Sequence, residues 1–382
     1  MSVQKVAIAG ASLAGLAAAR ALRRQSFAGE IVIVGDEPHP PYDRPPLSKE
    51  FLTGTATMDD IALGGSADLD VEWRLGTPAT GIDAPTRSLR LADGTEIRAD
   101  ALIVATGARA RELGNPGGLT GLHTLRTLDD AIALRADLRP GARLVVIGAG
   151  FIGAEVASSA RSLGLDVTVV ETLPTPLAGP LGPEMGGICA QLHGDHGVPL
   201  LTGVPVSGLS GTDRVEAVEL ADGTRLPADV VVAGIGSLPN VEWLAGSGLE
   251  IAGGVVTDAS GATSVPGVWA TGDCAVIRGE RRSEHWTHAV EHSMITVAAL
   301  LGDTAPVRKA PYFWSDQYGA RIQFAGHHEP GDAVRVVEGD PDSRSFLAVY
   351  ERDSEPVAVL GMNQPKLFTR WRRQLRATPQ EA

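Results

Sequence analysis

The chain has 382 residues, enough for two or three domains with well-buried cores. Its formal net charge of −13 argues against a general nucleic-acid binder, because such proteins need a positive surface toward phosphate groups. The two cysteines, Cys189 and Cys274, form no C-x-x-C or zinc pattern, so we expect a reducing compartment and no metal site.

The first apolar run, residues 6–19, follows Lys5 and imitates the core of a secretory signal peptide. It contains a glycine-rich turn and leads into a predicted helix and a predicted strand at residues 31–34. Cleavage would destroy this βαβ unit, so we interpret the run as part of the fold. No apolar run reaches the roughly 18 residues that a membrane span needs. We therefore expect a cytoplasmic protein that binds neither membranes nor nucleic acids.

Residues 5–36 form the first predicted dinucleotide-binding unit, a strand, a glycine-rich turn, a helix of small residues and a second strand. Gly10 and Gly15 occupy the first and third glycine positions of the G-x-G-x-x-G motif. Ser12 stands at the second, where a small side chain still allows close approach and its hydroxyl can donate to a phosphate. We expect Asp36, at the end of the second strand, to bind ribose hydroxyls, with Glu37 as the alternative.

Residues 143–171 repeat this pattern with the complete motif Gly148, Gly150 and Gly153. A turn free of side chains lets backbone N–H groups and the positive end of the helix approach a pyrophosphate, although an ordinary glycine-rich βα turn remains an alternative. Glu171, eighteen residues after Gly153, is the ribose candidate. A carboxylate repels a 2′-phosphate, and no Arg or Lys follows in ETLPTPL, so we predict NADH over NADPH.

A second pair of similar segments indicates an internal duplication. Residues 91–107 read LADGTEIRADALIVATG, and residues 220–236 read LADGTRLPADVVVAGIG. In each, Asp-Gly predicts a hairpin turn, followed by a β-rich run that ends at a glycine-containing loop. The sequence therefore predicts two dinucleotide-binding halves, and two such halves imply two bound nucleotides.

Two further segments carry candidate ligand-binding residues. Residues 38–52, PHPPYDRPPLSKEFL, are stiffened by prolines and present Arg44 and Lys49 in fixed positions; a solvated basic turn is the alternative. Residues 268–275, VWATGDCA, place Asp273 at a turn, where its carboxylate can accept a hydrogen bond from a ribityl hydroxyl; a plain Asx-turn is the alternative.

The histidines do not predict a metal site. His285, His288 and His292 are spaced so that two or three can share one face of a predicted helix. No carboxylate or cysteine partner accompanies them, and we interpret them as structural, as we do His193 and His196.

The C-terminal part differs in composition from the rest of the chain. Residues 311–326 are the most aromatic stretch, and three β-like runs follow at residues 333–337, 345–351 and 356–362. Residues 366–376, KLFTRWRRQLR, hold five cations and no acid. We expect a small α+β domain that ends in a basic segment, for which a solvated amphipathic helix is the alternative interpretation.

These motifs resemble the FAD-dependent, NAD(P)H-using ferredoxin reductases of bacterial oxygenase and cytochrome P450 systems, the putidaredoxin-reductase-like family. The resemblance covers nearly the whole chain, and DRPPLSK and PYFWSDQ are its most specific segments. It implies an α/β fold with two duplicated Rossmann-like domains, as in glutathione reductase, and a small α+β C-terminal domain. The implied domains are residues 1–110 and 238–308 for FAD, residues 111–237 for NAD, and residues 309–382 for the C-terminal interface domain.

The resemblance also assigns cofactor contacts. The FAD contacts it implies are Gly10, Ala14, Gly15, Asp36, Arg44, Lys49, Ala79, Thr106, Gly107, Arg126, Asp273, Trp286 and Trp314, with Ser12 in place of the more common glycine. The nicotinamide-cofactor contacts it implies are Gly148, Gly150, Ile152, Gly153, Glu171 and Gly236. It further implies that Lys49 and Glu155 form a catalytic ion pair near the flavin N5.

The electron acceptor is expected to be a protein. The chain has no cysteine before Cys189, so it lacks the redox-active pair of glutathione-reductase-type flavoproteins. Ferredoxins are typically acidic, and residues 366–376, with Arg308 and Lys309 as further candidates, are the predicted docking surface. We expect a [2Fe–2S] or other small ferredoxin as partner and a monomer or weak dimer. An NADH oxidase acting on oxygen or a small molecule, and a flavin signalling protein like apoptosis-inducing factor, are the alternatives.

Overall fold

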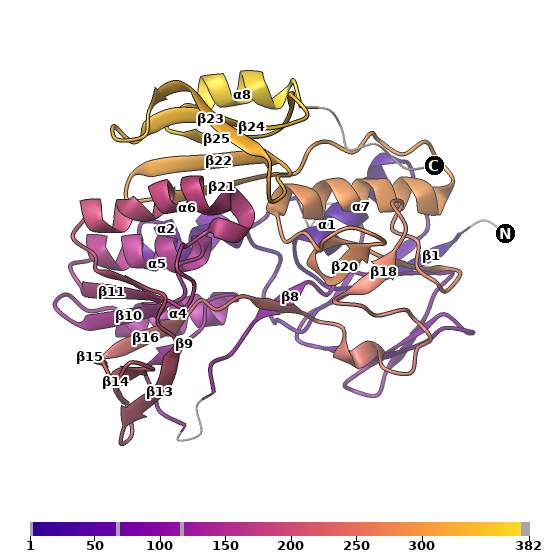
Figure 1. Ribbon diagram of the computed structural model, residues 1–382. Helices are drawn as coiled ribbons and strands as arrows, with labels where there is room; N and C mark the ends of the chain where they lie inside the picture. The colour runs from indigo at the N-terminus through magenta and orange to yellow at the C-terminus, as the bar shows by residue number, and fades with distance from the viewer. Residues whose placement is uncertain (1–2, 66–68, 115–117, 376–382) are drawn as a thin grey trace.

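Three five-stranded sheets organise the protein, whose computed structural model describes residues 3–65, 69–114 and 118–375 (Figure 1). The first sheet is parallel and has the order β19-β7-β1-β2-β3. Its strands are β1 (Lys5–Ala9), β2 (Glu30–Val34), β3 (Glu72–Arg74), β7 (Ala101–Val104) and β19 (Val268–Ala270). Helix α1 (Leu13–Arg24) connects β1 to β2 and packs against α7 (Trp286–Leu301).

The second sheet repeats this arrangement with the order β12-β11-β10-β16-β9, again parallel. Its strands are β9 (Leu122–His123), β10 (Arg143–Ile147), β11 (Asp166–Glu171), β12 (Leu200–Thr202) and β16 (Val230–Ala233). Helix α5 (Phe151–Ser162) takes the place that α1 has in the first half. Helix α4 (Leu128–Asp137) precedes the sheet strand β10, and α6 (Ala178–Asp195) follows β11.

Close backbone contacts fix the same turn in both halves. Gly10 has φ of +125°, and a Cβ there would lie 2.0 Å from the carbonyl oxygen of Ala105. Gly148 has φ of +101°, and its Cβ would lie 2.3 Å from the carbonyl oxygen of Gly234. Only glycine fits where the turn after the first strand passes so close to the loop after the neighbouring strand, β7 or β16. The shared constraint confirms the duplication that the sequence predicts.

Each half also carries a three-stranded antiparallel sheet. Strands β4 (Ala79–Asp83), β5 (Ser88–Leu91) and β6 (Glu96–Arg98) belong to the first, and β13 (Val206–Gly211), β14 (Val215–Leu220) and β15 (Arg225–Pro227) to the second. The predicted Asp-Gly turns are present in both. The Asp93 side chain accepts from the Thr95 amide at 2.8 Å, and Asp222 accepts from the Thr224 amide at 2.9 Å.

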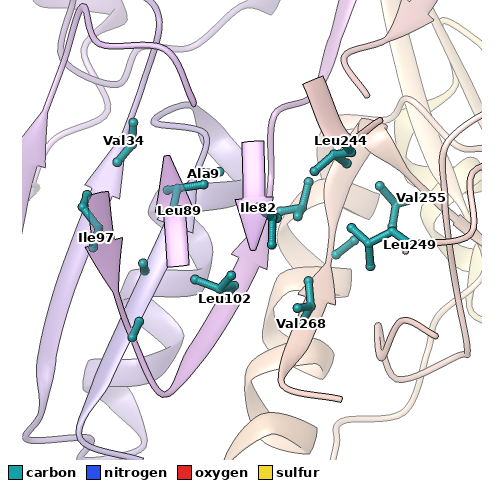
Figure 2. Packing of buried hydrophobic residues seen from close by; sticks show 14 of the residues in the cluster. Ala9, Val34, Ile82, Leu89, Ile97, Leu102, Leu244, Leu249, Val255 and Val268 are labelled. Carbon is teal, nitrogen blue, oxygen red and sulfur yellow. The ribbon is translucent and has the colours of Figure 1, made fainter. Parts of the chain in front are cut away.

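Figure 2 shows how the first half closes over its core. Ala9, Val34 and Leu102 of the parallel sheet face Ile82 and Leu89 of the small antiparallel sheet. Leu244, Leu249, Val255 and Val268, from much later in the chain, complete the same cluster. Burial of these apolar side chains therefore joins the N-terminal residues to the segment after residue 238.

Short elements connect the two halves. Strand β8 (Ala108–Ala110) leaves the first half and pairs antiparallel with β17 (Ser237–Pro239), which returns from the second. The remaining short elements are η1 (Pro45–Ser48), α2 (Glu50–Thr53), α3 (Met58–Ile61), η3 (Glu242–Leu244), β18 (Val255–Thr257), η4 (Gly272–Cys274) and β20 (Ala275–Ile277).

The third sheet is antiparallel, has the order β21-β22-β25-β24-β23, and lies above α5 and α6 in Figure 1. Its strands are β21 (Tyr312–Gln317), β22 (Ala320–Gly326), β23 (Ala333–Asp340), β24 (Ser345–Arg352) and β25 (Glu355–Met362). The hydroxyl of Tyr350 donates to the carbonyl of Leu181 in α6 at 2.6 Å. Helix α8 (Pro365–Arg372) packs on the other face of this sheet through the buried Phe368. The predicted fold class is confirmed.

Within the described ranges we find no helix that has both the length and the apolar character needed to cross a membrane.

Candidate redox site between two dinucleotide cradles

The two glycine-rich turns present open helix N-termini. Ser12 caps α1 without a side-chain capping hydrogen bond, and α5 is capped by Gly150, which has no side chain. A Cβ at Gly150 would meet no heavy atom within 4 Å, so open space lies where a pyrophosphate would approach. Unpaired backbone N–H groups at such an end favour an anion. Both turns therefore fit the phosphates of a dinucleotide.

The Pro-rich segment delivers Arg44 to the first cradle. The Arg44 guanidinium donates to Ser12 Oγ at 3.3 Å, to Glu37 Oε1 at 2.5 Å and to the carbonyl of Arg126 at 2.6 Å. It also lies over the ring of Tyr42, 5.2 Å from the centroid. Arg44 is thus fixed beside the turn, and the solvated-turn interpretation of this residue is wrong.

Asp273 lies in the same region, paired with Arg126. Their charged groups are 2.5 Å apart, and Arg126 Nε also donates to the carbonyl of Ala108 at 2.9 Å. A Cβ at Gly272, which has φ of +73°, would come within 2.7 Å of the Ala14 Cβ, so the Thr-Gly-Asp turn lies directly on α1. The carboxylate therefore faces the first cradle in an ion pair.

Asp36 and Glu171 do not occupy equivalent positions in the two halves. Gly10 donates its amide to the carbonyl of Val34, and Gly148 donates to that of Val170. The residue equivalent to Glu171 is therefore Gly35, and Asp36 lies one position later, exposed. Glu37, the alternative, already accepts from Arg44 and from the Tyr42 hydroxyl, both at 2.5 Å. Binding of the FAD ribose by Asp36 stays a prediction.

Glu171 is held against the second glycine-rich turn. Its Oε2 accepts from the Ala149 amide at 2.8 Å, and its Oε1 accepts from the Leu173 amide at 2.9 Å. The carboxylate is thus fixed at the end of β11, beside the open start of α5. A negative charge at this point suits ribose hydroxyls and disfavours a phosphate.

Lys49 and Glu155 meet between the halves, as the resemblance implies. Lys49 Nζ lies 2.6 Å from Glu155 Oε2, and the side chains are 12% and 3% exposed. Lys49 follows η1 of the first half, whereas Glu155 lies on α5, which starts at the second cradle. The ion pair therefore links the two halves of the protein.

Sequence reasoning missed the hydroxyls around this pair. Ser48 Oγ donates to Glu155 Oε2 at 2.5 Å, and Ser315 Oγ donates to Glu155 Oε1 at 2.6 Å. The residues are separated by more than a hundred positions along the chain, so no local pattern marks them. Only their position in the motifs LSK and WSD could have drawn attention to them.

Aromatic side chains gather beside the ion pair. Trp286 and Trp314 meet edge to face with centroids 6.4 Å apart, and Tyr312 stacks on Trp314 at 5.9 Å. The Trp286 indole donates to Asp43 at 2.7 Å. Burial, the largest cause, raises the pKa of Asp43 above its ordinary value. Trp286 begins α7 and Trp314 lies on β21, so two parts of the chain supply one aromatic wall.

The other predicted contacts are Thr106, Gly107, Ala79, Ile152 and Gly236. Thr106 Oγ1 donates to the carbonyl of Asn240 at 2.7 Å, and the Asn240 side chain returns a bond to the carbonyl of Thr106 at 3.0 Å. A Cβ at Gly107 or at Gly236 would meet no heavy atom within 4 Å. Ala79 is the first residue of β4, and Ile152 is 47% exposed. Their contacts with cofactors stay predictions.

Of the three histidines at the start of α7, His292 is buried, and His285 and His288 are half-buried. His288 and His292 stack with centroids 5.1 Å apart, and His285 stacks on Phe313 at 4.7 Å. Burial lowers the pKa of His288 to about 4 and that of His292 to about 3. Within the described ranges no group of three or more metal-binding side chains is assembled. His193, also buried, pairs with the Tyr318 hydroxyl at 2.8 Å, and His196 stacks on Tyr318.

The two cysteines are not paired. Cys189 and Cys274 are both free and buried. Burial raises the pKa of the Cys189 thiol to about 12, and the same cause raises that of Cys274. Buried thiols of this kind are unreactive, so the chain contributes no redox-active disulfide.

The predicted docking surface is partly engaged in contacts. Lys366, Arg370 and Arg373 are exposed, and Arg376 lies outside the described residues. Arg372 is half-buried over the Tyr312 ring, 4.1 Å from its centroid. Arg308 pairs with Glu280 at 2.7 Å, and Lys309 pairs with Glu291 at 3.6 Å. Lys366, Arg370, Arg373 and the paired but exposed Lys309 are therefore the cations of this predicted surface that face solvent.

Comparisons with known proteins agree with this geometry. A family model described as pyridine nucleotide-disulphide oxidoreductase matches residues 4–293, and one described as reductase C-terminal matches residues 312–381. The chain belongs to the pyridine nucleotide-disulphide oxidoreductase family. The resemblance stated from the motifs is confirmed.

Relatives within this family are similar over most of their length. Rhodocoxin reductase of Rhodococcus erythropolis is 38% identical over 371 residues, which cover 94% of this chain and 87% of the relative. The ferredoxin–NAD(+) reductase component of the biphenyl dioxygenase system of Paraburkholderia xenovorans is 40% identical, with 89% and 85% covered. The covalent putidaredoxin reductase–putidaredoxin complex contains a chain with a TM-score of 0.93 and 35% identity, with 98% and 93% covered.

Proposed function

We propose that this chain is an NADH-dependent flavoprotein reductase, which passes electrons from NADH through FAD to a small iron–sulfur ferredoxin that serves a cytochrome P450 or a Rieske-type oxygenase. The observation that carries the proposal is the buried Lys49–Glu155 pair, which joins two dinucleotide cradles in a chain without a cysteine pair. The relatives named as ferredoxin reductases support the same activity.

The first half fits FAD. The close approach at Gly10 and the fixed Arg44 and Arg126–Asp273 groups make a cradle suited to an adenine dinucleotide with a ribityl chain. We assign this half to residues 1–110 and 238–308. The residues that would hold FAD are Gly10, Ser12, Ala14, Gly15, Asp36, Arg44, Lys49, Ala79, Thr106, Gly107, Arg126, Asp273, Trp286 and Trp314.

The second half, residues 111–237, fits NADH. The open Gly150 cap would receive the pyrophosphate, and the fixed carboxylate of Glu171 would accept from the ribose hydroxyls. The residues that would hold NADH are Gly148, Gly150, Ile152, Gly153, Glu171 and Gly236.

When bound, FAD supplies the chemistry that takes a hydride from NADH and delivers single electrons. The chain's own residues supply position and field. Trp286 and Trp314 would exclude water from one side of the reacting rings, and Lys49 and Glu155 would place charged groups beside them. A carboxylate that is already held in one orientation before reaction costs no reorganisation when charge develops next to it.

Two features support a protein as the electron acceptor: the lack of a redox-active cysteine pair and the exposed cations of the C-terminal domain. Both cysteines are buried and free, so electrons are not routed through a disulfide. Residues 309–382 form the domain that we assign to partner docking, through the exposed cations Lys366, Arg370 and Arg373. With free thiols and NADH as donor, the cytoplasm is the compartment that suits this activity.

NADH-driven cytochrome c reduction, with and without a panel of [2Fe–2S] and [3Fe–4S] ferredoxins, tests the proposal. We expect rapid reduction only when a suitable ferredoxin is present. Rapid oxygen consumption without any ferredoxin would instead show an NADH oxidase. Slow turnover with every acceptor would instead indicate a signalling flavoprotein.

A further inference from the structure

Three donors converge on one buried carboxylate. Glu155 is 2% exposed and receives Lys49 and Ser48 at Oε2 and Ser315 at Oε1. Ser48 and Ser315 are themselves 2% and 0% exposed. Each of them comes from a different part of the fold, η1 of the first half and β21 of the C-terminal sheet.

The direction of the Ser315 hydrogen bond is determined by its neighbours. Gln317 Nε2 donates to Ser315 Oγ at 3.3 Å, which uses an acceptor position of that oxygen. The single hydroxyl hydrogen is then free for Glu155 Oε1 at 2.6 Å. Ser48 has one weaker acceptor, the carbonyl of Pro45 at 3.3 Å, so its hydrogen also points to Glu155, at 2.5 Å.

Of the three donors, Lys49 is the one that has a second acceptor and open space beside it. Its ammonium already donates to the carbonyl of Pro45 at 2.9 Å. It also lines a cavity of about 270 Å³, whose other walls include Ser158, Asp316 and Gln317. The Glu155 carboxylate has no comparable open space to move into, because it is buried between α5, η1 and β21.

We propose that Ser48 and Ser315 are positioning residues, which hold the Glu155 carboxylate charged and in one orientation while Lys49 moves away from it. The proposal rests on the role given above to the Lys49–Glu155 pair. A buried carboxylate that loses its cation is strongly unfavourable unless other donors satisfy it. The two hydroxyls bind one oxygen each, so the carboxylate keeps a charge-assisted hydrogen bond at both ends. Ser315 thereby makes the C-terminal sheet part of the hydride-transfer site.

The kinetic test is Ser315→Ala, with Ser343→Ala as the control. Ser343 lies in the same C-terminal domain as Ser315, but its hydroxyl donates to the carbonyl of Asp340 at 2.8 Å. We expect Ser315→Ala to lower the limiting rate of flavin reduction by NADH about tenfold with unchanged NADH affinity, as losing one charge-assisted bond would. Ser343→Ala should match the wild type, and Ser315→Thr should recover most of the rate. A normal limiting rate in Ser315→Ala would overturn the proposal.

The stability test is a double-mutant cycle on the FAD-loaded protein and needs no turnover. Ser315→Ala should raise the equilibrium constant for unfolding about tenfold when Glu155 is present. The increase should be smaller in a Glu155→Gln background, because the neutral side chain does not need the hydroxyl to stabilise a charge. Equal losses in both backgrounds would contradict the assignment. If Ser315→Ala does not fold, Ser48→Ala at the other oxygen supports the same cycle.

The two proposals fail in different ways. If Glu155→Ala is reduced by NADH at the wild-type rate, the role of the ion pair is wrong. If Glu155→Ala is slow while Ser315→Ala and Ser48→Ala are normal, only the positioning role of the serines is wrong.

Discussion

At the scale of single residues, Lys49 and Glu155 carry the most specific expectation. We expect Lys49→Ala or Glu155→Ala to slow flavin reduction by NADH by about tenfold or more, well beyond any change in FAD content, because the oriented charge pair is lost. Lys49→Ala should also lower stability, since it leaves the buried carboxylate without its cation. Anaerobic stopped-flow absorbance measures the rate, and wild-type rates in both variants would refute the role.

Glu171 carries the second prediction at this scale. Its carboxylate is held by the amides of Ala149 and Leu173, so it cannot easily turn away from a 2′-phosphate. We therefore expect kcat/KM for NADH to exceed that for NADPH by about tenfold or more. Glu171→Ala should narrow the difference, mainly by weakening NADH binding. Comparable kcat/KM values of the wild type for NADH and NADPH would show that this carboxylate does not discriminate between the two cofactors.

Among the elements, α8 should steer the protein partner. Charge reversal at Arg370 and Arg373 removes exposed cations, and we expect it to raise the apparent KM for ferredoxin several-fold, more at low salt. Ferricyanide reduction by NADH should stay intact, because the cofactor sites are untouched. Arg372 is a poor choice for this test, since its guanidinium lies over Tyr312. An unchanged ferredoxin response would exclude this surface.

Helix α7 should make stability depend on pH. Burial lowers the pKa of His288 to about 4 and that of His292 to about 3, below the unfolded value of about 6.5. The neutral forms are therefore fully stabilising above about pH 6.5, and stability falls as pH falls toward the folded values.

His292→Leu tests this dependence. Both ring nitrogens of His292 lack a hydrogen-bond partner in the described part of the chain, so an apolar side chain of similar size loses nothing there. We expect Tm at pH 5 to rise relative to the wild type by more than Tm at pH 8 does. An equal shift at the two values would contradict the titration.

The sequence predicts those elements that depend on interactions between residues close together along the chain. Hairpins at Asp93-Gly94 and Asp222-Gly223 follow from local turn chemistry, and the three β-like runs near the C-terminus form β23, β24 and β25. The equivalence of Gly35 to Glu171 could not be predicted, because it depends on the strand register against the turn. The serines around Glu155 were missed for the same reason, since tertiary assembly alone brings them together.

At the scale of the whole molecule, the three parts of the fold meet at one carboxylate. The first half supplies Lys49 and Ser48, the second supplies Glu155, and the C-terminal sheet supplies Ser315. The same sheet presents Trp314 to the aromatic wall and packs against the helix α8 that we assign to docking. If the proposed assignment is right, the NADH and FAD sites adjoin this buried carboxylate, and the sheet that supplies Ser315 also carries the proposed docking helix.

The stoichiometry of anaerobic electron transfer tests this account most directly. The FAD-loaded protein is mixed with NADH and an excess of a [2Fe–2S] ferredoxin, and both NADH oxidation and ferredoxin reduction are followed by absorbance. Because NADH gives two electrons and the cluster takes one, we predict two reduced ferredoxins for each NADH consumed. NADH consumption without ferredoxin reduction would contradict the account.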